Sequence, residues 1–489
     1  MSKSIKTNFI FNLINTVIGL LFPLIVFPYA SRILLADGIG QVQFYQSIIN
    51  YIVLLTGLGI PLYGIKEIAR VRDNIEDLSR TTIELILLGL ILSIIGYLIV
   101  AVLCCVVGQI QDNIPLFLIL SSTILLTNIG CPWFYNGIED FKYITIRGII
   151  VRLICLFFLF VFVKTRDDLL LYGVYTVVGS LGNNVINFIR LRKYISFSTI
   201  FHNRINFWRH LKPAAAVFLL NIVTSIYVNL DSVMLGFLSN TTAVGYYTGA
   251  TKISHVLVTV VISLGTVLLP RSSYLIKKGC MDDFFTLSVK SYNFITMLSF
   301  PILSGVLILS PSIILLLCGN SFTPSIITLR IIAPIIVFIG ISNLLGIQIL
   351  YPLGKVKLVT ICTAIGACVN LLLNFLLIPF WQENGAAVAT AMAELSVTMT
   401  LLLIVRKIAH IPFVSKKTGQ YFLFSFILAP ICYFVQKHIN GELLIILIST
   451  ILGTIIYISL LIVVKDELIV NIFSQIKVKL LGTSKNEKI

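Results

Sequence analysis

The chain has 489 residues, of which 58% are hydrophobic and only 11% are charged, whereas a typical soluble domain carries about 25% charged and about 45–50% apolar residues. No soluble fold of this length buries so much apolar surface, so the composition excludes a cytosolic enzyme, a secreted disulfide scaffold and a disordered chain. The formal net charge of +16 indicates the bias of Lys and Arg toward cytoplasmic loops of a membrane protein and requires no nucleic acid.

Apolar runs separated by short polar breaks predict about fourteen transmembrane helices, because a helix needs about 20 apolar residues to cross a bilayer. The first run begins at Phe9 without a small-residue cleavage site, which favours a retained helix over a signal peptide. The run at 285–317 exceeds one crossing, and Pro301 and Pro311 predict a break or kink in it. In chain order the predicted spans are 9–34, 40–63, 82–107, 115–136, 143–163, 169–190, 213–238, 244–269, 285–317, 326–352, 356–380, 384–405, 419–436 and 443–464.

The distribution of basic residues predicts the orientation of these helices. An even number of spans places both termini on one side. Of the 36 Lys and Arg, five lie within spans and three in the loops of the other side (Lys164, Arg166 and Lys437), so about 28 remain on the side of the termini. We therefore expect both termini in the cytoplasm, together with 191–212 and with 64–81, whose apolar spacing predicts a short interfacial helix.

Two pairs of short motifs predict an internal repeat. The turn 133–142 before the fifth span resembles 349–357 before the eleventh, and Gly40 opens the second span as Gly245 opens the eighth. A six-helix unit used twice gives two lobes related by a pseudo-twofold axis along the membrane normal. We predict an all-α polytopic membrane fold with two pseudo-symmetric six-helix lobes and two C-terminal helices. The predicted boundaries are 1–200 for the N-terminal lobe, 201–410 for the C-terminal lobe and 411–489 for the added helices and cytoplasmic tail.

Ionisable residues within the spans are the candidate site residues, because each costs roughly 2.5–3.5 kcal/mol at a helix centre on insertion scales and such groups usually face the bundle interior. The basic residues, expected to bind substrate in a central cavity, are Arg32, Arg147, Arg152, Lys252 and Arg330. The acidic residues expected to couple an ion or to pair with these bases are Asp231 and Glu394. Arg32 and Arg330 lie nearer the outer ends of their spans, where snorkelling or a structural pair is the alternative.

The sign of these charges indicates the kind of cargo. A cavity with more Arg and Lys than carboxylate favours an anionic ligand, and a guanidinium binds phosphate bidentately. Glu84, near the start of its span, is expected to be interfacial. The sequence therefore favours a phosphate-bearing, amphiphilic cargo.

Motifs for catalysis or cofactor binding are missing from the sequence. It contains no Walker motif, no H-E-x-x-H, no G-x-S-x-G and no C-x-x-C pair among its nine cysteines. Four of the five histidines lie in or beside predicted loops and are expected to be solvated or interfacial. We expect no enzyme, no cofactor and no metal site.

Several motifs resemble those of Wzx-type polysaccharide repeat-unit flippases, which belong to the multidrug, oligosaccharidyl-lipid and polysaccharide exporter superfamily. The resemblance covers nearly the whole chain and ends in the last two helices. The motifs are Pro132-Trp-Phe-Tyr-Asn-Gly-Ile-Glu-Asp-Phe-Lys-Tyr-Ile-Thr-Ile146, Asn229-Leu-Asp-Ser-Val-Met-Leu-Gly236 followed by Val244-Gly-Tyr-Tyr247, 342–355, and Gly385-Ala-Ala-Val-Ala-Thr390 followed by Glu394.

The resemblance implies both an architecture and an activity. It implies two six-helix lobes around a central cavity, in a multi-pass protein of the bacterial inner membrane. It also implies the transfer of undecaprenyl-diphosphate-linked oligosaccharide repeat units to the outer leaflet for O-antigen or capsule synthesis. Arg and Lys would offset the desolvation of the diphosphate. The implied partners are this polyprenyl-diphosphate-linked oligosaccharide, membrane lipids and, as a further candidate, the polysaccharide polymerase machinery.

Other functions remain open from the sequence. A flippase for lipid II or a teichoic-acid precursor shares the fold and the basic cavity. A multidrug antiporter is less consistent with that cavity and with the turn 133–142. A membrane-embedded polymerase or acyltransferase should have a large outer loop with catalytic polar residues, and every predicted outer loop is short. A membrane scaffold is the remaining alternative.

Overall fold

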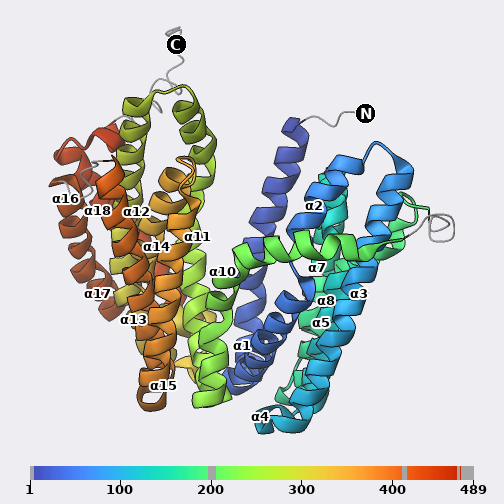
Figure 1. Cartoon of the computed structure of the whole chain (residues 1–489). Helices are drawn as coiled ribbons and strands as arrows, with labels where there is room; N and C mark the ends of the chain where they lie inside the picture. The colour runs from blue at the N-terminus through green and yellow to red at the C-terminus, as the bar shows by residue number, and fades with distance from the viewer. Residues whose placement is uncertain (1–4, 197–204, 410–415, 471–473, 475–489) are drawn as a thin grey trace. The chain divides into compact units, whose positions relative to one another are not determined.

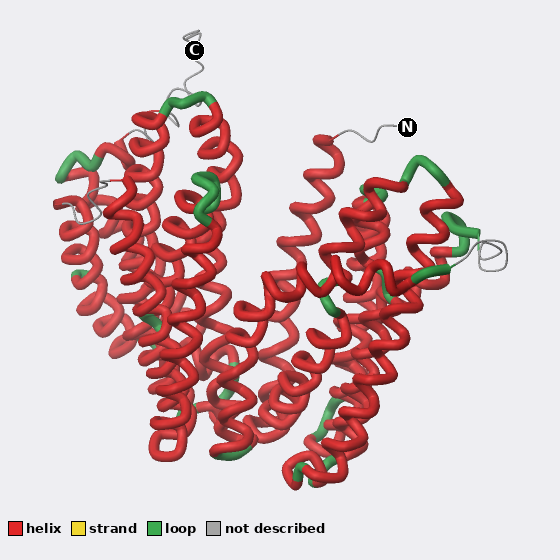
Figure 2. The backbone as a smooth tube through the Cα atoms, viewed as in Figure 1, coloured by secondary structure: helices red, strands yellow, loops and turns green. Residues whose placement is uncertain are grey.

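The computed structural model describes residues 5–196, 205–409, 416–470 and 474. Within these ranges the regular structure is helical and contains no strand (Figure 2). Eleven helices in the described ranges are long and apolar enough to cross a membrane. The predicted all-α polytopic membrane fold is therefore confirmed.

The first half of the chain forms long membrane-length helices joined by short ones, coloured from blue to green in Figure 1. In chain order these are α1 (Ile5–Gly57), α2 (Ile60–Val71), α3 (Ile75–Val106), α4 (Gly108–Gln111), α5 (Ile114–Ile129), α6 (Pro132–Gly137), α7 (Phe141–Phe162), η1 (Arg166–Asp168), α8 (Leu169–Leu191), η2 (Phe207–His210) and α10 (Leu211–Leu238).

The second half continues in the same manner, through yellow to red in Figure 1. Its helices are α11 (Thr241–Lys277), α12 (Met281–Leu317), η3 (Asn320–Phe322), α13 (Ser325–Ile332), α14 (Ile335–Asn343), η4 (Leu344–Leu350), α15 (Val356–Ala409), α16 (Lys416–Phe426), α17 (Leu428–His438) and α18 (Glu442–Val463).

Contacts between residues divide the chain into two compact units, each considered by itself. The first comprises Met1–Thr248, Leu317–Ser321 and Asn374–Ala386, and the second comprises Gly249–Leu316, Phe322–Leu373 and Ala387–Ile489. The first unit includes α10 because α10 packs on α1 and α2. These units are defined by contacts between residues, whereas the predicted lobes 1–200 and 201–410 were defined by an internal sequence repeat. The two lobes therefore stay a prediction. Part of the predicted linker 191–212 and most of the C-terminal tail lie outside the described residues.

Two helices each contain two of the predicted spans. The helix α1 continues through Leu35, whose backbone is left-handed (φ 57°), and α15 continues through Gln382 (φ 47°). Both residues fall at or beside predicted breaks, so the chain reverses there with hardly any loop. This merging lowers the number of separate helices below the number of predicted spans, and the predicted count of fourteen stays a prediction.

The helix α12 runs unbroken across Pro301 and Pro311. Proline removes one backbone donor, but neighbouring groups in a membrane bundle can satisfy the freed carbonyl. Of the two alternatives predicted for 285–317, a break or a kink, the break does not occur.

Side chains explain where several helices begin. The Asn74 side chain accepts a hydrogen bond from the amide of Glu76 at 2.9 Å, and Glu76 and Asp77 place negative charge at the positive end of α3. The Asn113 side chain caps α5 by accepting from the Leu116 amide at 3.2 Å. These caps fix the residues at which the two apolar helices start.

The short amphipathic helix predicted at 64–81 corresponds mainly to α2. Ile60, Tyr63 and Ile68 are buried, whereas Lys66 and Arg70 are exposed. The rest of the segment forms a turn and the first turns of α3. A short amphipathic helix is therefore present, but it begins and ends earlier than predicted.

The aromatic turn singled out in the sequence forms the core between α2, α3 and α6. Trp133, Phe134 and Tyr135 are all buried in it. Glycine is required on both sides of this contact, because a Cβ on Gly64 would lie 2.8 Å from the Trp133 ring and one on Gly137 would lie 2.6 Å from Ile68. This core fixes the end of the loop from which α7 starts.

Candidate functional site

A basic pocket of about 490 Å³ lies between the start of α7 and the end of α8, within the first unit. Its lining combines three cations and one carboxylate with an apolar wall. The lining residues are Asp140, Lys142, Tyr143, Ile146, Arg147, Ile150, Val151, Ile186 and Arg190. One of the predicted site residues, Arg147, therefore lines a pocket.

Two asparagines of α8 hold Arg147 in this pocket. Its Nε donates to the side-chain Oδ1 of Asn183 at 3.0 Å, and one terminal nitrogen donates to the side-chain Oδ1 of Asn187. Its guanidinium carbon also lies 5.0 Å from the centre of the Tyr143 ring. These contacts fix the direction of the guanidinium without neutralising its charge.

Arg190 forms the other side of the pocket. It donates to Asp140 at 3.2 Å and to the Tyr194 hydroxyl at 3.0 Å, and its guanidinium carbon lies 3.5 Å from the centre of the Tyr143 ring. The Tyr194 hydroxyl also donates to Asp140 at 3.2 Å. Burial raises the pKa of Tyr194, so this hydroxyl keeps its proton. Lys142 is exposed at the mouth.

A second polar cluster surrounds Glu84 in α3. Glu84 is fully buried, and its carboxylate accepts hydrogen bonds from donors on both sides. The donors are Arg80 Nε at 3.1 Å, the Asn206 amide at 2.8 Å, Arg209 Nε at 2.7 Å and His210 Nε2 at 2.9 Å. The cluster ties the segment before α10 to α3. These donors replace water around the carboxylate, and the expectation that Glu84 lies at the membrane interface stays a prediction.

His210 connects the same cluster to α2. It is buried, and its Nδ1 lies 2.8 Å from the Tyr63 hydroxyl. A neutral imidazole with its proton on Nε2 donates to Glu84 and accepts from Tyr63, which satisfies both nitrogens. Burial lowers the pKa of His210. His210 is therefore not solvated, whereas the interfacial position that was the alternative stays a prediction.

Arg152 and Arg32 occupy other positions of the first unit. Arg152 is partly buried in α7, and a Cβ on Gly19 of α1 would lie 3.7 Å from one of its terminal nitrogens. Arg147 and Arg152 thus share a helix but reach toward different neighbours, α8 and α1. Arg32 is exposed, donates to the Pro28 carbonyl at 3.3 Å and lies against Gly319.

Asp231 joins three helices of the first unit. It is buried, and it accepts hydrogen bonds from the Tyr247 hydroxyl of α11 and from the Asn374 amide of α15, the latter at 2.6 Å. Two residues earlier, the Asn229 side chain accepts a hydrogen bond from Asn50 of α1 at 3.2 Å. Sequence analysis identified the carboxylate but missed its amide and hydroxyl partners.

The other three predicted residues belong to the second unit. Lys252 is exposed on α11 and Glu394 is partly buried on α15. Arg330 is exposed on α13, and its Nε donates to the Leu307 carbonyl at 3.0 Å and to the Ser310 hydroxyl at 2.8 Å. These bonds to α12 favour the structural role left open for Arg330.

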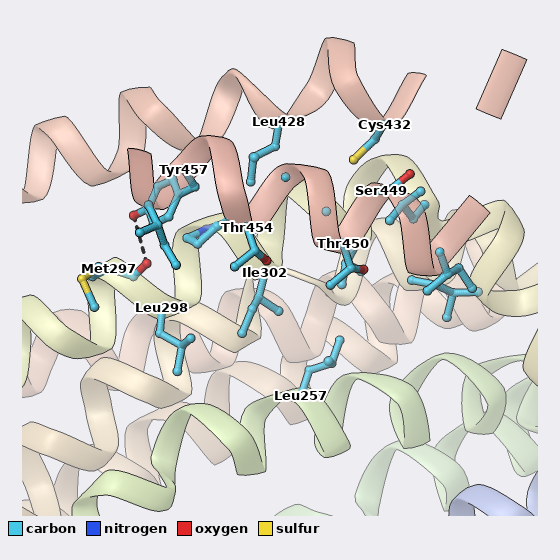
Figure 3. A pocket seen from close by; sticks show the side chains of 18 of the residues that line it. Leu257, Met297, Leu298, Ile302, Leu428, Cys432, Ser449, Thr450, Thr454 and Tyr457 are labelled. Carbon is cyan, nitrogen blue, oxygen red and sulfur yellow. Dashed lines mark hydrogen bonds between the residues drawn. The ribbon is translucent and has the colours of Figure 1, made fainter. Parts of the chain in front are cut away.

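An apolar pocket of about 410 Å³ lies within the second unit, mainly between α12, α17 and α18 (Figure 3). Its polar oxygens are hydroxyls such as those of Ser449, Thr450 and Thr454, and none of its lining residues is charged. At one end the Tyr457 hydroxyl donates to the Met297 carbonyl at 2.9 Å. Such a pocket accepts hydrocarbon but cannot replace the hydration of a phosphate.

The described residues contain no group of three or more His, Cys, Asp or Glu side chains that could hold a metal ion.

Sequence analysis missed the residues that surround Arg147 in the basic pocket, namely Tyr143, Asn183, Asn187 and Arg190. Asn183 and Asn187 are four residues apart in an apolar helix, and that spacing places them on one face. Polar side chains inside a span need partners, so this pair was a usable signal.

Comparison with known proteins places these features in a family context. The family described as "Polysaccharide biosynthesis protein" matches residues 5–276. A "Putative O-antigen transporter" of Escherichia coli (strain K12) is 25% identical over 407 residues, which cover 82% of this chain and 97% of that protein. A protein of the same description from Shigella dysenteriae is 24% identical over 382 residues, covering 78% and 95%.

Solved structures share the fold at low sequence identity. The lipid II flippase MurJ in an inward closed conformation has a TM-score of 0.72 at 17% identity, covering 94% of this chain and 100% of that one. An inward-facing multidrug resistance MATE family transporter of the MOP superfamily has a TM-score of 0.64 at 13% identity, covering 80% and 94%. The chain therefore has a polytopic transporter fold of this type.

Proposed function

The chain belongs to the polysaccharide biosynthesis protein family, and from this premise we propose that it is a flippase for lipid-linked polysaccharide precursors. Its substrate is an undecaprenyl-diphosphate-linked oligosaccharide repeat unit for O-antigen or capsule, carried from the cytoplasmic to the outer leaflet of the bacterial inner membrane. The observation that carries this proposal is the similarity to two putative O-antigen transporters over 97% and 95% of their lengths.

The basic residues within the helices are assigned to the diphosphate. Removing a phosphate from water is expensive unless fixed cations and donors replace the water. Arg152 is partly buried within α7, and Lys252 is exposed within α11. We assign these two residues to the path of the diphosphate, with Arg32 and Arg147 as further candidates. Both termini and the basic segments 64–81 and 191–212 are assigned to the cytoplasm.

Asp231 is assigned to ion coupling. Its carboxylate is buried and accepts from side chains of α11 and α15. Protonation, or capture of a cation, would weaken these hydrogen bonds and so change how α10 is held against both helices. A buried carboxylate that links three helices is therefore suited to connect an ion gradient to helix movement. Glu394 is the second candidate, on the α15 segment of the second unit.

Two alternative cargoes are less well supported. The likeness to the lipid II flippase MurJ, at 17% identity, and to a MATE transporter, at 13%, concerns the fold. The curated relatives that match most of this chain are putative O-antigen transporters. We propose that this chain is a transporter and not an enzyme, in line with those relatives, and that the polysaccharide polymerase machinery is a further candidate partner.

The proposal is tested by deleting the gene in its own host and analysing membrane lipids by mass spectrometry. We expect lipid-linked repeat units to accumulate on the inner leaflet while surface polysaccharide disappears, and we expect the intact gene to restore both. Accumulation of lipid II or of a teichoic-acid precursor instead would assign the alternative cargo. Normal surface polysaccharide with no accumulated precursor, in a strain without a second gene of this family, would refute the proposal.

A further inference from the structure

The basic pocket between α7 and α8 combines three cations with an apolar wall and offers few groups that could bind a sugar. We propose that it binds the phosphate head group of an anionic phospholipid of the surrounding bilayer, with an acyl chain along its isoleucine wall. This site goes beyond the proposed function, because a resident lipid binds there whether or not substrate is carried.

The first support is the charge of the lining. Lys142, Arg147 and Arg190 contribute three positive charges, and the single carboxylate is Asp140. Asp140 already accepts from Arg190 and from the Tyr194 hydroxyl. The lining therefore keeps two positive charges. Basic pockets between helices on the cytoplasmic side of a membrane are typical sites for anionic lipid head groups.

The second support is the set of donors that remain. A guanidinium has five N–H donors; Arg147 uses Nε and one terminal nitrogen on the asparagines, and Arg190 uses one terminal nitrogen on Asp140 and Tyr194. The Tyr143 ring packs against both guanidiniums, with its centre 5.0 Å from the Arg147 and 3.5 Å from the Arg190 guanidinium carbon. This packing fixes the direction of the two guanidiniums, and their remaining N–H donors can bind the oxygens of one phosphate.

The start of α7 adds to this positive potential. Asp140 precedes the helix, but its side chain makes no capping hydrogen bond to it. The first backbone amides of α7 and the positive end of its dipole therefore lie beside the cations. Side-chain charges and helix direction favour an anion at the same place.

The third support is the apolar wall that continues from the cations. Ile146 and Ile150 of α7 and Ile186 of α8 line the pocket beside the cations. Their side chains are 43%, 51% and 41% exposed, respectively. An exposed isoleucine within a membrane span contacts hydrocarbon. A ligand with a phosphate at one end and an acyl chain at the other matches both parts of the pocket.

The lining also distinguishes a phospholipid from the lipid-linked sugar. Neutral hydrogen-bonding groups, which sugars require, are represented in the lining by the Tyr143 hydroxyl. Nothing else in the lining, apart from the engaged Asp140, accepts from sugar hydroxyls. The composition therefore favours a small phosphodiester head group such as phosphatidylglycerol.

The test measures lipid retained by the purified full-length protein. The protein is reconstituted in nanodiscs of equal phosphatidylglycerol and phosphatidylcholine, extracted mildly, and its bound lipid is quantified by native mass spectrometry. We expect the wild type to retain phosphatidylglycerol over phosphatidylcholine. Lys142→Gln should weaken that retention about fivefold, since one basic residue near the membrane surface contributes about that factor.

The matched control is Lys193→Gln, which removes the same charge from an exposed residue outside the lining. It should retain phosphatidylglycerol as the wild type does. Equal retention by Lys142→Gln and the wild type, or equal retention of both phospholipids, would overturn the proposal. Retention of added undecaprenyl diphosphate in place of phosphatidylglycerol would overturn it in favour of a substrate site. Because no transport is measured, failure here is separate from failure of the flippase assignment.

Discussion

The backbones of Gly40 in α1 and Gly245 in α11 touch: a Cβ on Gly40 would lie 2.7 Å from the Gly245 amide nitrogen and 1.7 Å from the Thr241 carbonyl oxygen. In return, a Cβ on Gly245 would lie 1.9 Å from the Ala36 carbonyl oxygen. The two glycines are the pair that the sequence matched as repeat equivalents. Residues related by a twofold axis meet in this way when they lie beside that axis, although the repeat itself stays a prediction.

This crossing predicts a large effect of a single methyl group. Gly40→Ala and Gly245→Ala each place a Cβ on a neighbouring backbone that has no flexible side chain to move aside. We expect a destabilisation of about 3 kcal/mol, at the upper end for overpacking, seen as a lower midpoint of thermal unfolding in detergent. Gly57→Ala in the same helix is the control, because nothing lies within 4 Å of its added Cβ. Equal midpoints for all three variants would contradict the close crossing.

The buried carboxylate of Glu84 predicts a second stability effect. Glu84→Ala leaves two arginines, one histidine and one backbone amide without their acceptor. Because both arginines can reach solvent, the cost is that of the buried donors left without an acceptor, about 1–3 kcal/mol. Glu76→Ala, an exposed acid in the same helix, should cost far less. A midpoint for Glu84→Ala that equals that of Glu76→Ala would show that the cluster contributes nothing to stability.

His210 predicts how this stability depends on pH. Burial lowers its pKa in the folded protein, whereas the unfolded chain has the ordinary value of about 6.5. As pH falls below about 6.5, the unfolded state takes up the proton first, so the folded state loses stability until the folded pKa is reached. The unfolding midpoint should therefore drop between pH 7.5 and pH 5.5, and less so in His210→Gln. His438→Gln, which removes an exposed histidine, should behave as the wild type does. The same drop in His210→Gln as in the wild type would remove His210 as its cause.

Substitutions of Arg152 test whether a bidentate contact with phosphate is needed for transport. Arg152→Gln and Lys252→Gln should be expressed normally and should reduce export at least about tenfold, since a hydrogen bond to a charged group contributes about 1.5–3 kcal/mol. Arg152→Lys keeps the charge but loses the fork, so its export should be intermediate. Lys193→Gln is the control for general loss of charge. Full export by both Gln variants would remove these residues from the mechanism, and loss of expression would assign them a structural role.

The orientation is tested with single cysteines in a cysteine-free background. Lys66→Cys and Lys193→Cys should be shielded from an impermeant thiol reagent in intact cells, whereas Arg166→Cys should react. The native cysteines must be removed because Cys105, Cys280 and Cys368 are exposed. Labelling of Lys193→Cys from outside would reverse the predicted topology.

Hydropathy predicted the membrane fold well, because a bilayer allows few alternatives to long apolar helices, whereas Pro301 and Pro311 predicted a break that α12 does not have. The candidate charges were found for the same reason, since each is conspicuous in an apolar run. Their partners were harder to predict. Asn183 and Asn187 fix Arg147 only because α8 packs beside α7, and Glu84 meets Arg209 and His210 from more than a hundred residues away. Such pairings depend on helix packing, which periodicity alone does not specify.

The apolar pocket between α12, α17 and α18 bears on how this protein behaves outside a membrane. In a bilayer, lipid chains can enter the pocket and complete the packing of these helices. Two hydrogen bonds hold these helices together. The Tyr457 hydroxyl of α18 donates to the Met297 carbonyl of α12. The Gln436 side-chain amide of α17 donates to the Ile308 carbonyl of α12. A detergent whose tail is too short to fill the space would leave its apolar lining without contacts. The choice of detergent chain length should therefore decide whether the last helices stay in place during purification.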